Sequence, residues 1–237
     1  MSPMLHPFAL TLERPLSTAA GAIEERRGFL VGVDDPTRGV GEATPLPGWT
    51  ESLDACEAAL RDPPEVWRDV AAALDDQPAT PAARHGYRLA VLDAAAREQG
   101  RSLAALLAER GDFPDPAESV PVNATVGDGS VEATVAAARD AVDAGFETVK
   151  LKVGVRGLDA DIDRIQAVRA RIDAAIRVDA NGAWDQETAE EAVDAFASLG
   201  VEYVEQPLPA GSLSGLADLR GRGVEIAVDE SLGERGV

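Results

Sequence analysis

The stretch that decides the fold is residues 148–153, TVKLKV, a short apolar strand pattern that carries two lysines. Similar strand patterns follow at a regular spacing: AIRVD at 175–179, EYVE at 202–205 and EIAVD at 225–229. Helical patterns separate them at 158–172, 185–199 and 212–220, and one earlier unit has a strand at 120–124 and a helix at 130–144. Repeated strand–helix units with short loops predict a parallel sheet with right-handed crossovers. The steps of 27, 26 and 24 residues from Lys152 to Asp179, Glu205 and Asp229 favour a (β/α) barrel over an open doubly wound sheet.

The residues before this repeat have a different pattern. Strands are expected at 8–12, 28–33 and 40–43, and helices at 52–74 and 81–109. Residues 111–119 are rich in proline and acidic residues, which is typical of a domain boundary. The predicted fold class is therefore α/β, with an α+β domain over residues 1–118 and a (β/α) barrel domain over residues 119–237.

Composition narrows the classes of function. The chain has 237 residues and a formal net charge of −20, which repels nucleic acid and anionic membrane surfaces. The chain contains neither an apolar run of about 18 residues nor a basic leader, so a cytoplasmic protein is expected. Cys56 is the only cysteine, which excludes a disulfide or a thiolate metal cluster within one chain.

Lysine is almost absent from the sequence. Of the 22 basic residues only Lys150 and Lys152 are lysines, and the heavy acid content is typical of a salt-loving organism. Two lysines that persist in such a sequence, two positions apart on one strand, point to the same face of the sheet. They are therefore candidates for chemistry.

Carboxylates end the three strands that follow the lysine strand. In a (β/α) barrel the carboxyl ends of the strands converge, so Asp179, Glu205 and Asp229 are expected to approach Lys150 and Lys152. Neighbouring carboxylates repel one another unless a cation neutralises them. Hard oxygen ligands without His or Cys favour Mg²⁺, or Mn²⁺, over zinc.

Simpler interpretations stay open for the same residues. The lysines could only neutralise Asp179 or Glu205, and the carboxylates could cap the helices that follow them. Asn181 and Glu230 are expected to hold the metal ligands in place, with Glu230 as a direct ligand the alternative. Arg177 lies on the face of Asp179, one pleat deeper, where a buried ion pair and a substrate contact are equally expected.

Four strings occur in order at barrel spacing, and together they resemble the enolase superfamily, in the branch of muconate cycloisomerases, dipeptide epimerases and o-succinylbenzoate synthases. The strings are VKLKVG at 149–154, VDANGAW at 178–184, EQP at 205–207 and DES at 229–231. The resemblance extends to residues 1–118, which look like the capping domain of that family. It is closest to the o-succinylbenzoate synthase group, because the cap is compact and a short ESLGE stretch follows Asp229.

The resemblance implies roles for these residues. Asp179, Glu205 and Asp229 would bind one Mg²⁺, and Lys152, with Lys150 beside it, would remove a proton alpha to the carboxylate of a small-molecule substrate. The metal would stabilise the ene-diolate that forms, as the general chemistry of this superfamily requires. Dehydration to o-succinylbenzoate in menaquinone biosynthesis is the expected reaction, with a dipeptide epimerase or another racemase or cycloisomerase as the alternative.

The repeat is shorter than a whole barrel. A barrel of eight strands takes about 250 residues, whereas 118 residues follow position 119, enough for about five strands. The family's further lysine, on its sixth strand, has no counterpart after Ser231. The expectation is a C-terminally truncated chain, with an inactive fragment as a further alternative and a homo-oligomer formed by strand exchange as another.

Overall fold

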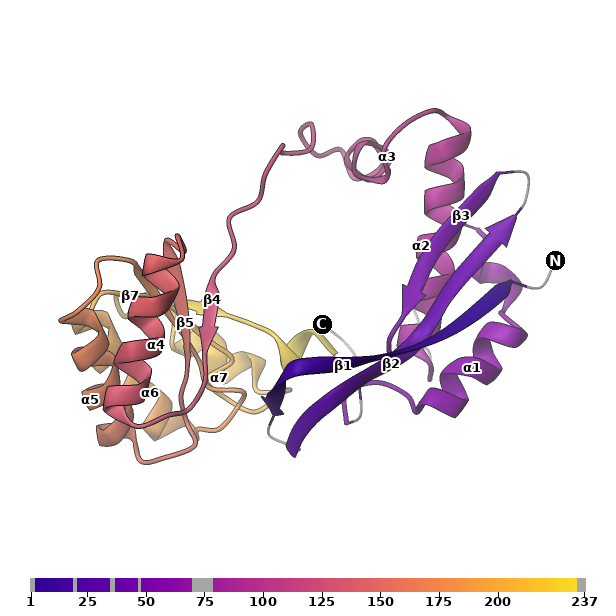
Figure 1. Ribbon diagram of the computed structural model, residues 1–237. Helices are drawn as coiled ribbons and strands as arrows, with labels where there is room; N and C mark the ends of the chain where they lie inside the picture. The colour runs from indigo at the N-terminus through magenta and orange to yellow at the C-terminus, as the bar shows by residue number, and fades with distance from the viewer. Residues whose placement is uncertain (1–2, 19–20, 35–36, 47, 70–78, 234–237) are drawn as a thin grey trace. The chain divides into compact units, whose positions relative to one another are not determined.

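The computed structural model describes residues 3–18, 21–34, 37–46, 48–69 and 79–233. The chain divides into two compact units, Met1–Ser119 and Val120–Val237. Each has its own sheet (Figure 1). Each also has its own hydrophobic core. The predicted class, an α+β domain followed by a five-stranded part of a parallel α/β fold, is confirmed.

The first unit is built on an antiparallel sheet. Strands β1 (Met4–Thr18), β2 (Gly21–Asp34) and β3 (Arg38–Ala43) pair in sequence order. The helical elements are α1 (Leu53–Arg61), the 3₁₀ turn η1 (Glu65–Trp67), α2 (Pro81–Glu98) and α3 (Leu103–Arg110). Buried residues of the sheet and of α1, η1 and α2 form one core, with Val31, Leu60 and Tyr87 among its members.

Helix α2 packs unusually close to β3, beside which it lies in Figure 1. A Cβ atom on Gly41 would come within 2.0 Å of the Gly86 carbonyl oxygen, and a Cβ on Gly39 within 2.0 Å of the Ala90 carbonyl oxygen. Only glycine on the strand permits this approach, and the small residues of α2 match it.

The two long helices predicted in this unit were wrong in extent. The first ends at Arg61, because Pro63 and Pro64 cannot continue a helix, and its predicted end at 70–74 lies outside the described residues. The second divides into α2 and α3 at Gly100, whose φ of 65° is a left-handed conformation that glycine adopts freely.

The second unit is a parallel sheet with helices between successive strands. The strands β4 (Ala124–Val126), β5 (Thr148–Lys152), β6 (Ala175–Asp179), β7 (Val201–Glu205) and β8 (Glu225–Ala227) pair in that order. Between them lie α4 (Val131–Asp143), α5 (Leu158–Arg169), α6 (Gln186–Ser198) and α7 (Leu213–Asp218), and the 3₁₀ turn η2 (Glu230–Gly233) follows β8 (Figure 1).

Alternation along the strands separates a core face from a polar face. Val149, Leu151, Ile176 and Val178 are fully buried and pack with apolar side chains of α5 and α6. The residues between them on β5 and β6 carry the lysines and Asp179 on the other face. The sheet thus presents its charged side chains together.

The strand predicted at 120–124 was wrong in position, since β4 begins only at Ala124. Val120 and Val122 are 75% and 68% exposed, so the apolar pattern there does not mark burial. Across the described residues, no helix has the length and apolar character needed to cross a bilayer.

Candidate metal centre and base

Strand register brings the candidate side chains into one row. Lys152 pairs with Asp179 across β5 and β6, and Asp179 pairs with Glu205 across β6 and β7. The row continues to Ala227 on β8, two residues before Asp229. These are the last residues of β5, β6 and β7, so the row lies at the carboxyl ends of the strands. Enzymes with parallel α/β sheets place their chemistry at this edge.

Lysine ammonium groups contact the carboxylates of this row. Lys150 Nζ lies 3.1 Å from Asp179 Oδ2 and 2.9 Å from Glu205 Oε2. Lys152 Nζ lies 2.6 Å from Asp179 Oδ2 and 2.6 Å from Asn181 Oδ1. These ion pairs agree with the alternative in which the lysines only neutralise Asp179 and Glu205. They also place both lysines beside the predicted metal ligands.

Burial and charge act in opposition on the pKa values of this cluster. Burial by itself raises the pKa of Asp179, but the hydrogen bond from Lys152 and the charges of both lysines outweigh it and hold that pKa below its usual value. Burial by itself lowers the pKa of Lys150, but its hydrogen bond to Glu205 and the charge of Asp179 leave that pKa raised. Both groups are therefore held in their charged forms.

Asn181 connects the lysine to a second carboxylate. Its side-chain oxygen accepts from Lys152, and its amide Nδ2 donates to Glu230 Oε1 at 3.1 Å. Its backbone N–H donates to Asp179 Oδ1 at 3.1 Å, in a left-handed turn with φ of 46°. The other oxygen of Glu230, Oε2, is buried and has no hydrogen-bond partner among the described residues.

The donor set has the chemistry that a hard divalent cation requires. Asp179 and Glu205 contact the two ammonium groups, Asp229 feels the charges of both lysines, and Glu230 accepts a hydrogen bond from Asn181. Asp229 is exposed overall, but partial burial of its carboxyl and the charges of Glu230 and Asp179 raise its pKa. This surplus of negative charge and the orphaned Glu230 oxygen fit a further cation.

The carboxylates are not assembled as a ready cage. Within the described ranges, no three Asp, Glu, His or Cys side chains are grouped so that they could hold a metal ion as they stand. The ammonium groups of Lys150 and Lys152 contact Asp179 and Glu205 instead. Metal binding through the predicted trio therefore stays a prediction.

The capping alternative does not describe Asp179 or Glu205. Helix α6 is capped by Asp185, whose side chain accepts from the Thr188 N–H at 2.9 Å, and the N-cap of α7 is Ser212. The side chains of Asp179 and Glu205 form ion pairs with the lysines instead.

Arg177 points its charge away from the row. Its Nε lies 2.7 Å from Glu202 Oε2, and its guanidinium stacks over the Tyr203 ring at 4.9 Å from the centroid. An ion pair is present, but the Glu202 side chain is 49% exposed, so the predicted burial of the pair was wrong.

Gln206 is a residue of the site that sequence reasoning missed. It is fully buried, and its Oε1 accepts from the backbone N–H of Asp229 at 2.9 Å and of Ser231 at 3.2 Å. Its Nε2 donates to the Leu208 carbonyl and to Ser231 Oγ, both at 2.8 Å. The side chain thereby joins the EQP and DES strings and holds the Asp229 segment. The sequence offered one signal for this role, namely that the EQP and DES strings occur together. Only the carboxylates of these strings were assigned a role from the sequence, and Gln206 was not.

Comparisons with known proteins agree with this geometry. Residues 133–236 match the family model described as enolase C-terminal domain-like. A crystal structure of the dipeptide epimerase of Methylococcus capsulatus, complexed with Mg and the dipeptide L-Arg-D-Lys, superposes with a TM-score of 0.79 at 30% identity, covering 98% of this chain and 69% of that one. The chain belongs to the enolase superfamily.

Two curated members of the enolase superfamily are similar to this chain at nearly equal identity. The L-Lys-D/L-Arg epimerase of Methylococcus capsulatus is 32% identical over 240 residues, which cover 93% of this chain and 65% of the relative. The o-succinylbenzoate synthase of Thermosynechococcus vestitus is 31% identical over 231 residues, covering 93% and 66%. The chain thus spans about two thirds of the length of these relatives, and their near-equal identity does not separate the two reactions.

Proposed function

We propose that this chain removes the proton alpha to the carboxylate of a small-molecule substrate, with Lys152 as the base and Asp179, Glu205 and Asp229 as ligands of one Mg²⁺ or Mn²⁺. One observation carries the proposal. The only two lysines of the chain contact Asp179 and Glu205 at the carboxyl ends of adjacent strands. The Mg in the solved dipeptide epimerase supports the choice of metal.

The side chains divide the work as follows. A bound divalent ion supplies attraction for the negative charge that develops on the substrate carboxylate. Lys152, as the neutral amine, takes the alpha proton and becomes an ammonium group. Asn181 accepts a hydrogen bond from that nitrogen and orients it, and Glu230 orients Asn181. Lys150 contributes a second positive charge beside Asp179 and Glu205.

We favour dehydration to o-succinylbenzoate as the overall reaction. Lys152 would remove the alpha proton and return a proton to the hydroxyl group on the neighbouring carbon, which would leave as water as its C–O bond breaks. The proposed reaction belongs to menaquinone biosynthesis, and we propose that the chain acts in the cytoplasm. This choice rests on the compact cap and on the short ESLGE stretch at 230–234, which resemble the o-succinylbenzoate synthase group. An epimerase must also deliver a proton to the opposite face of the substrate.

Dipeptide epimerisation is the second candidate. The 32% identity to the L-Lys-D/L-Arg epimerase favours it as strongly as the 31% identity to the synthase favours dehydration.

Solvent-deuterium exchange tests the shared first step. The protein is incubated in D₂O with Mg²⁺ and either the hydroxycarboxylate precursor of o-succinylbenzoate or a set of dipeptides, and mass spectrometry follows the alpha position and the product. We expect exchange that Lys152→Met lowers by at least about 100-fold. Arg222→Met is the matched control, because Arg222 also bridges two carboxylates, Glu190 and Asp194, away from the row.

The outcomes separate the candidates. Loss of water with an aromatic product supports the synthase, and exchange with inversion in a dipeptide supports the epimerase. Exchange that survives Lys152→Met removes Lys152 as the base. If Mg²⁺ neither supports exchange nor raises the unfolding temperature, the metal site is refuted.

A further inference from the structure

A buried ion pair lies behind the lysine strand and takes no part in the row. Arg164 of α5 has a side chain only 1% exposed, and that of Asp161, one turn earlier, is 0% exposed. Arg164 Nη1 lies 2.7 Å from Asp161 Oδ1. Moving each of the two charges out of water costs on the order of several kcal/mol in a protein. Apolar residues can often replace such a buried pair without loss of stability. The pair therefore calls for a role other than stability.

The arginine joins the ends of two diverging strands. The β4–β5 ladder ends with Val126 opposite Leu151. Beyond it, Arg164 donates from Nη1 to the Lys152 carbonyl at 3.1 Å and from Nη2 to the Gly127 carbonyl at 3.3 Å. The guanidinium thus takes the place of strand pairing at the next residue of each strand. One of those residues is Lys152.

The aspartate holds the turn on the other side of Lys152. Asp161 Oδ2 accepts from the Gly154 N–H at 2.7 Å, while the Val153 N–H donates to the Asp179 carbonyl at 3.0 Å. Gly154 has φ of 87°, and a Cβ there would come within 2.7 Å of Ala183 Cβ. The backbone from Lys152 to Gly154 is therefore tied at each residue.

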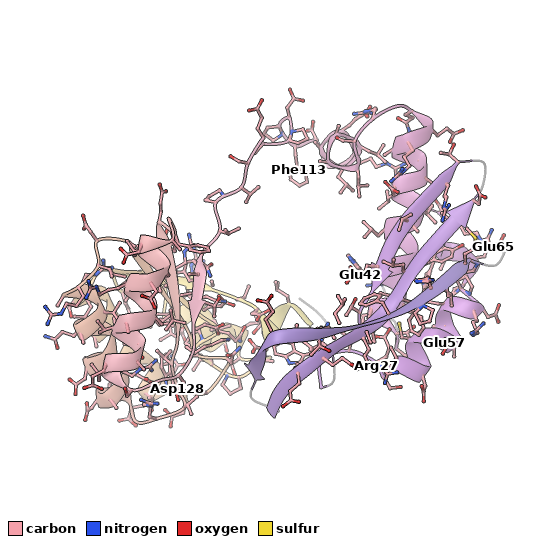
Figure 2. The ribbon with its side chains drawn as sticks, viewed as in Figure 1. Arg27, Glu42, Glu57, Glu65, Phe113 and Asp128 are labelled. Atoms are coloured by element: carbon pink, nitrogen blue, oxygen red, sulfur yellow. The ribbon has the colours of Figure 1, made fainter. Side chains whose placement is uncertain are left out.

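A second pair completes the network at the surface. Asp128, labelled in Figure 2 in the segment after β4, lies 3.2 Å from Arg164 Nη1 and 3.0 Å from Arg156 Nη2. Arg156 also donates to the Gly129 carbonyl at 2.8 Å. Two arginines and two aspartates balance in charge, so the network adds no net charge behind the row.

We infer that Arg164 and Asp161 are positioning residues for Lys152: they fix the backbone at the end of β5 and thereby aim the lysine side chain. This rests on the proposed function of Lys152 as the base. A catalytic group must be held within about 0.5 Å of its productive position by groups that lock its surroundings. Here Arg164 donates to the backbone carbonyl of Lys152, and Asp161 accepts from the N–H of Gly154, two residues later.

The scarcity of lysine allows a direct test. Protein grown with lysine labelled with ¹³C at Cε gives two lysine resonances, and Lys150→Arg leaves the Lys152 resonance alone. Spectra at a single pH compare the wild type with Arg164→Met and with Asp161→Leu/Arg164→Met. Arg169→Met is the matched control, because Arg169 lies on the same helix and donates to the carbonyls of Ala174, Leu199 and Gly200.

Stability and position respond differently if the inference holds. The double variant should unfold at a higher temperature than Arg164→Met alone, since it leaves neither buried charge unpaired, although the Gly154 N–H and the carbonyls of Lys152 and Gly127 lose these partners. We still expect its Lys152 resonance to move further than the Lys150 resonance, and further than in Arg169→Met. A Lys152 resonance that stays in place in the double variant, or that moves equally in Arg169→Met, overturns the inference.

An activity measurement adds a second readout. In the exchange assay the double variant should lose about 10- to 100-fold in turnover, with little change in KM. This is the range found for residues that hold directly acting groups in position. Wild-type turnover in the double variant overturns the inference. If the wild type itself exchanges no proton, the proposed function fails, and the lysine spectra alone then decide the positioning role.

Discussion

Replacing Gln206 with methionine should loosen the segment that carries Asp229. Methionine has nearly the same volume but cannot donate, so the change removes hydrogen bonds and leaves the packing in place. Gln206 accepts from two backbone N–H groups and donates to two oxygens, all in a fully buried position. Leaving the Asp229 and Ser231 N–H groups unpaired costs about 1–3 kcal/mol each. We expect a total loss of about 3 kcal/mol in the unfolding free energy of the second unit.

Hydrogen exchange and fluorescence measure the two parts of this effect. Mass-spectrometric hydrogen exchange should show lost protection at residues 229–231. Urea unfolding should be followed through Trp184, the one tryptophan of the second unit, after Trp49 and Trp67 are changed to phenylalanine. Gln166→Met, at an exposed position of α5, is the control and should change neither quantity. The reasoning is refuted if Gln206→Met retains both wild-type protection and a free energy within about 0.5 kcal/mol of wild type.

Three further outcomes are expected. Burial and then the charge of Glu51 raise the pKa of Cys56 from 9.0 to about 12, so a thiol reagent at pH 8 should label it only after unfolding. Between pH 9.0 and about 12 the Cys56 thiol ionises in the unfolded chain but not in the folded one. The contribution of Cys56 to the free energy of unfolding should therefore fall as the pH rises through this range. Unfolding curves at alkaline pH, compared with those of Cys56→Ala, measure this fall. Gly41→Ala should destabilise the first unit by about 1–3 kcal/mol in thermal melts, whereas Gly127→Ala, with open space at Cβ, should not. With a net charge of −20, the unfolding temperature should rise between 0.15 and 1 M KCl as the Debye length falls from about 8 to about 3 Å; a flat or falling temperature would contradict this.

Local pattern was sufficient where a segment is buried and regular. The strand at 175–179 occurs as predicted, because Ile176 and Val178 are fully buried between polar neighbours. The same reasoning misplaced the strand at 120–124, because Val120 and Val122 look apolar but lie exposed. Apolar character predicts a strand only where packing covers it, and packing is a property of the fold.

The candidate site divides in the same way. Lys150, Lys152, Asp179 and Glu205 could be brought together in advance, because strand ends of a parallel sheet meet at one edge. The outward pairing of Arg177 with Glu202 could not, since it depends on which neighbour a long side chain reaches. Sequence analysis missed Gln206, Asp161 and Arg164. The role of each depends on the buried groups that it contacts, and those contacts form only in the folded chain.

The amino-acid sequence alone determined the order of strands and helices in the second unit, the lysine doublet and the acidic strand ends, because residue spacing and alternation are local properties of the chain. The tertiary structure decided which charge meets which, how Gln206 holds the Asp229 segment, and how Arg164 bridges β4 and β5. These contacts join residues 12 to 37 positions apart, and their distances and burial arise only when the sheet and helices pack together.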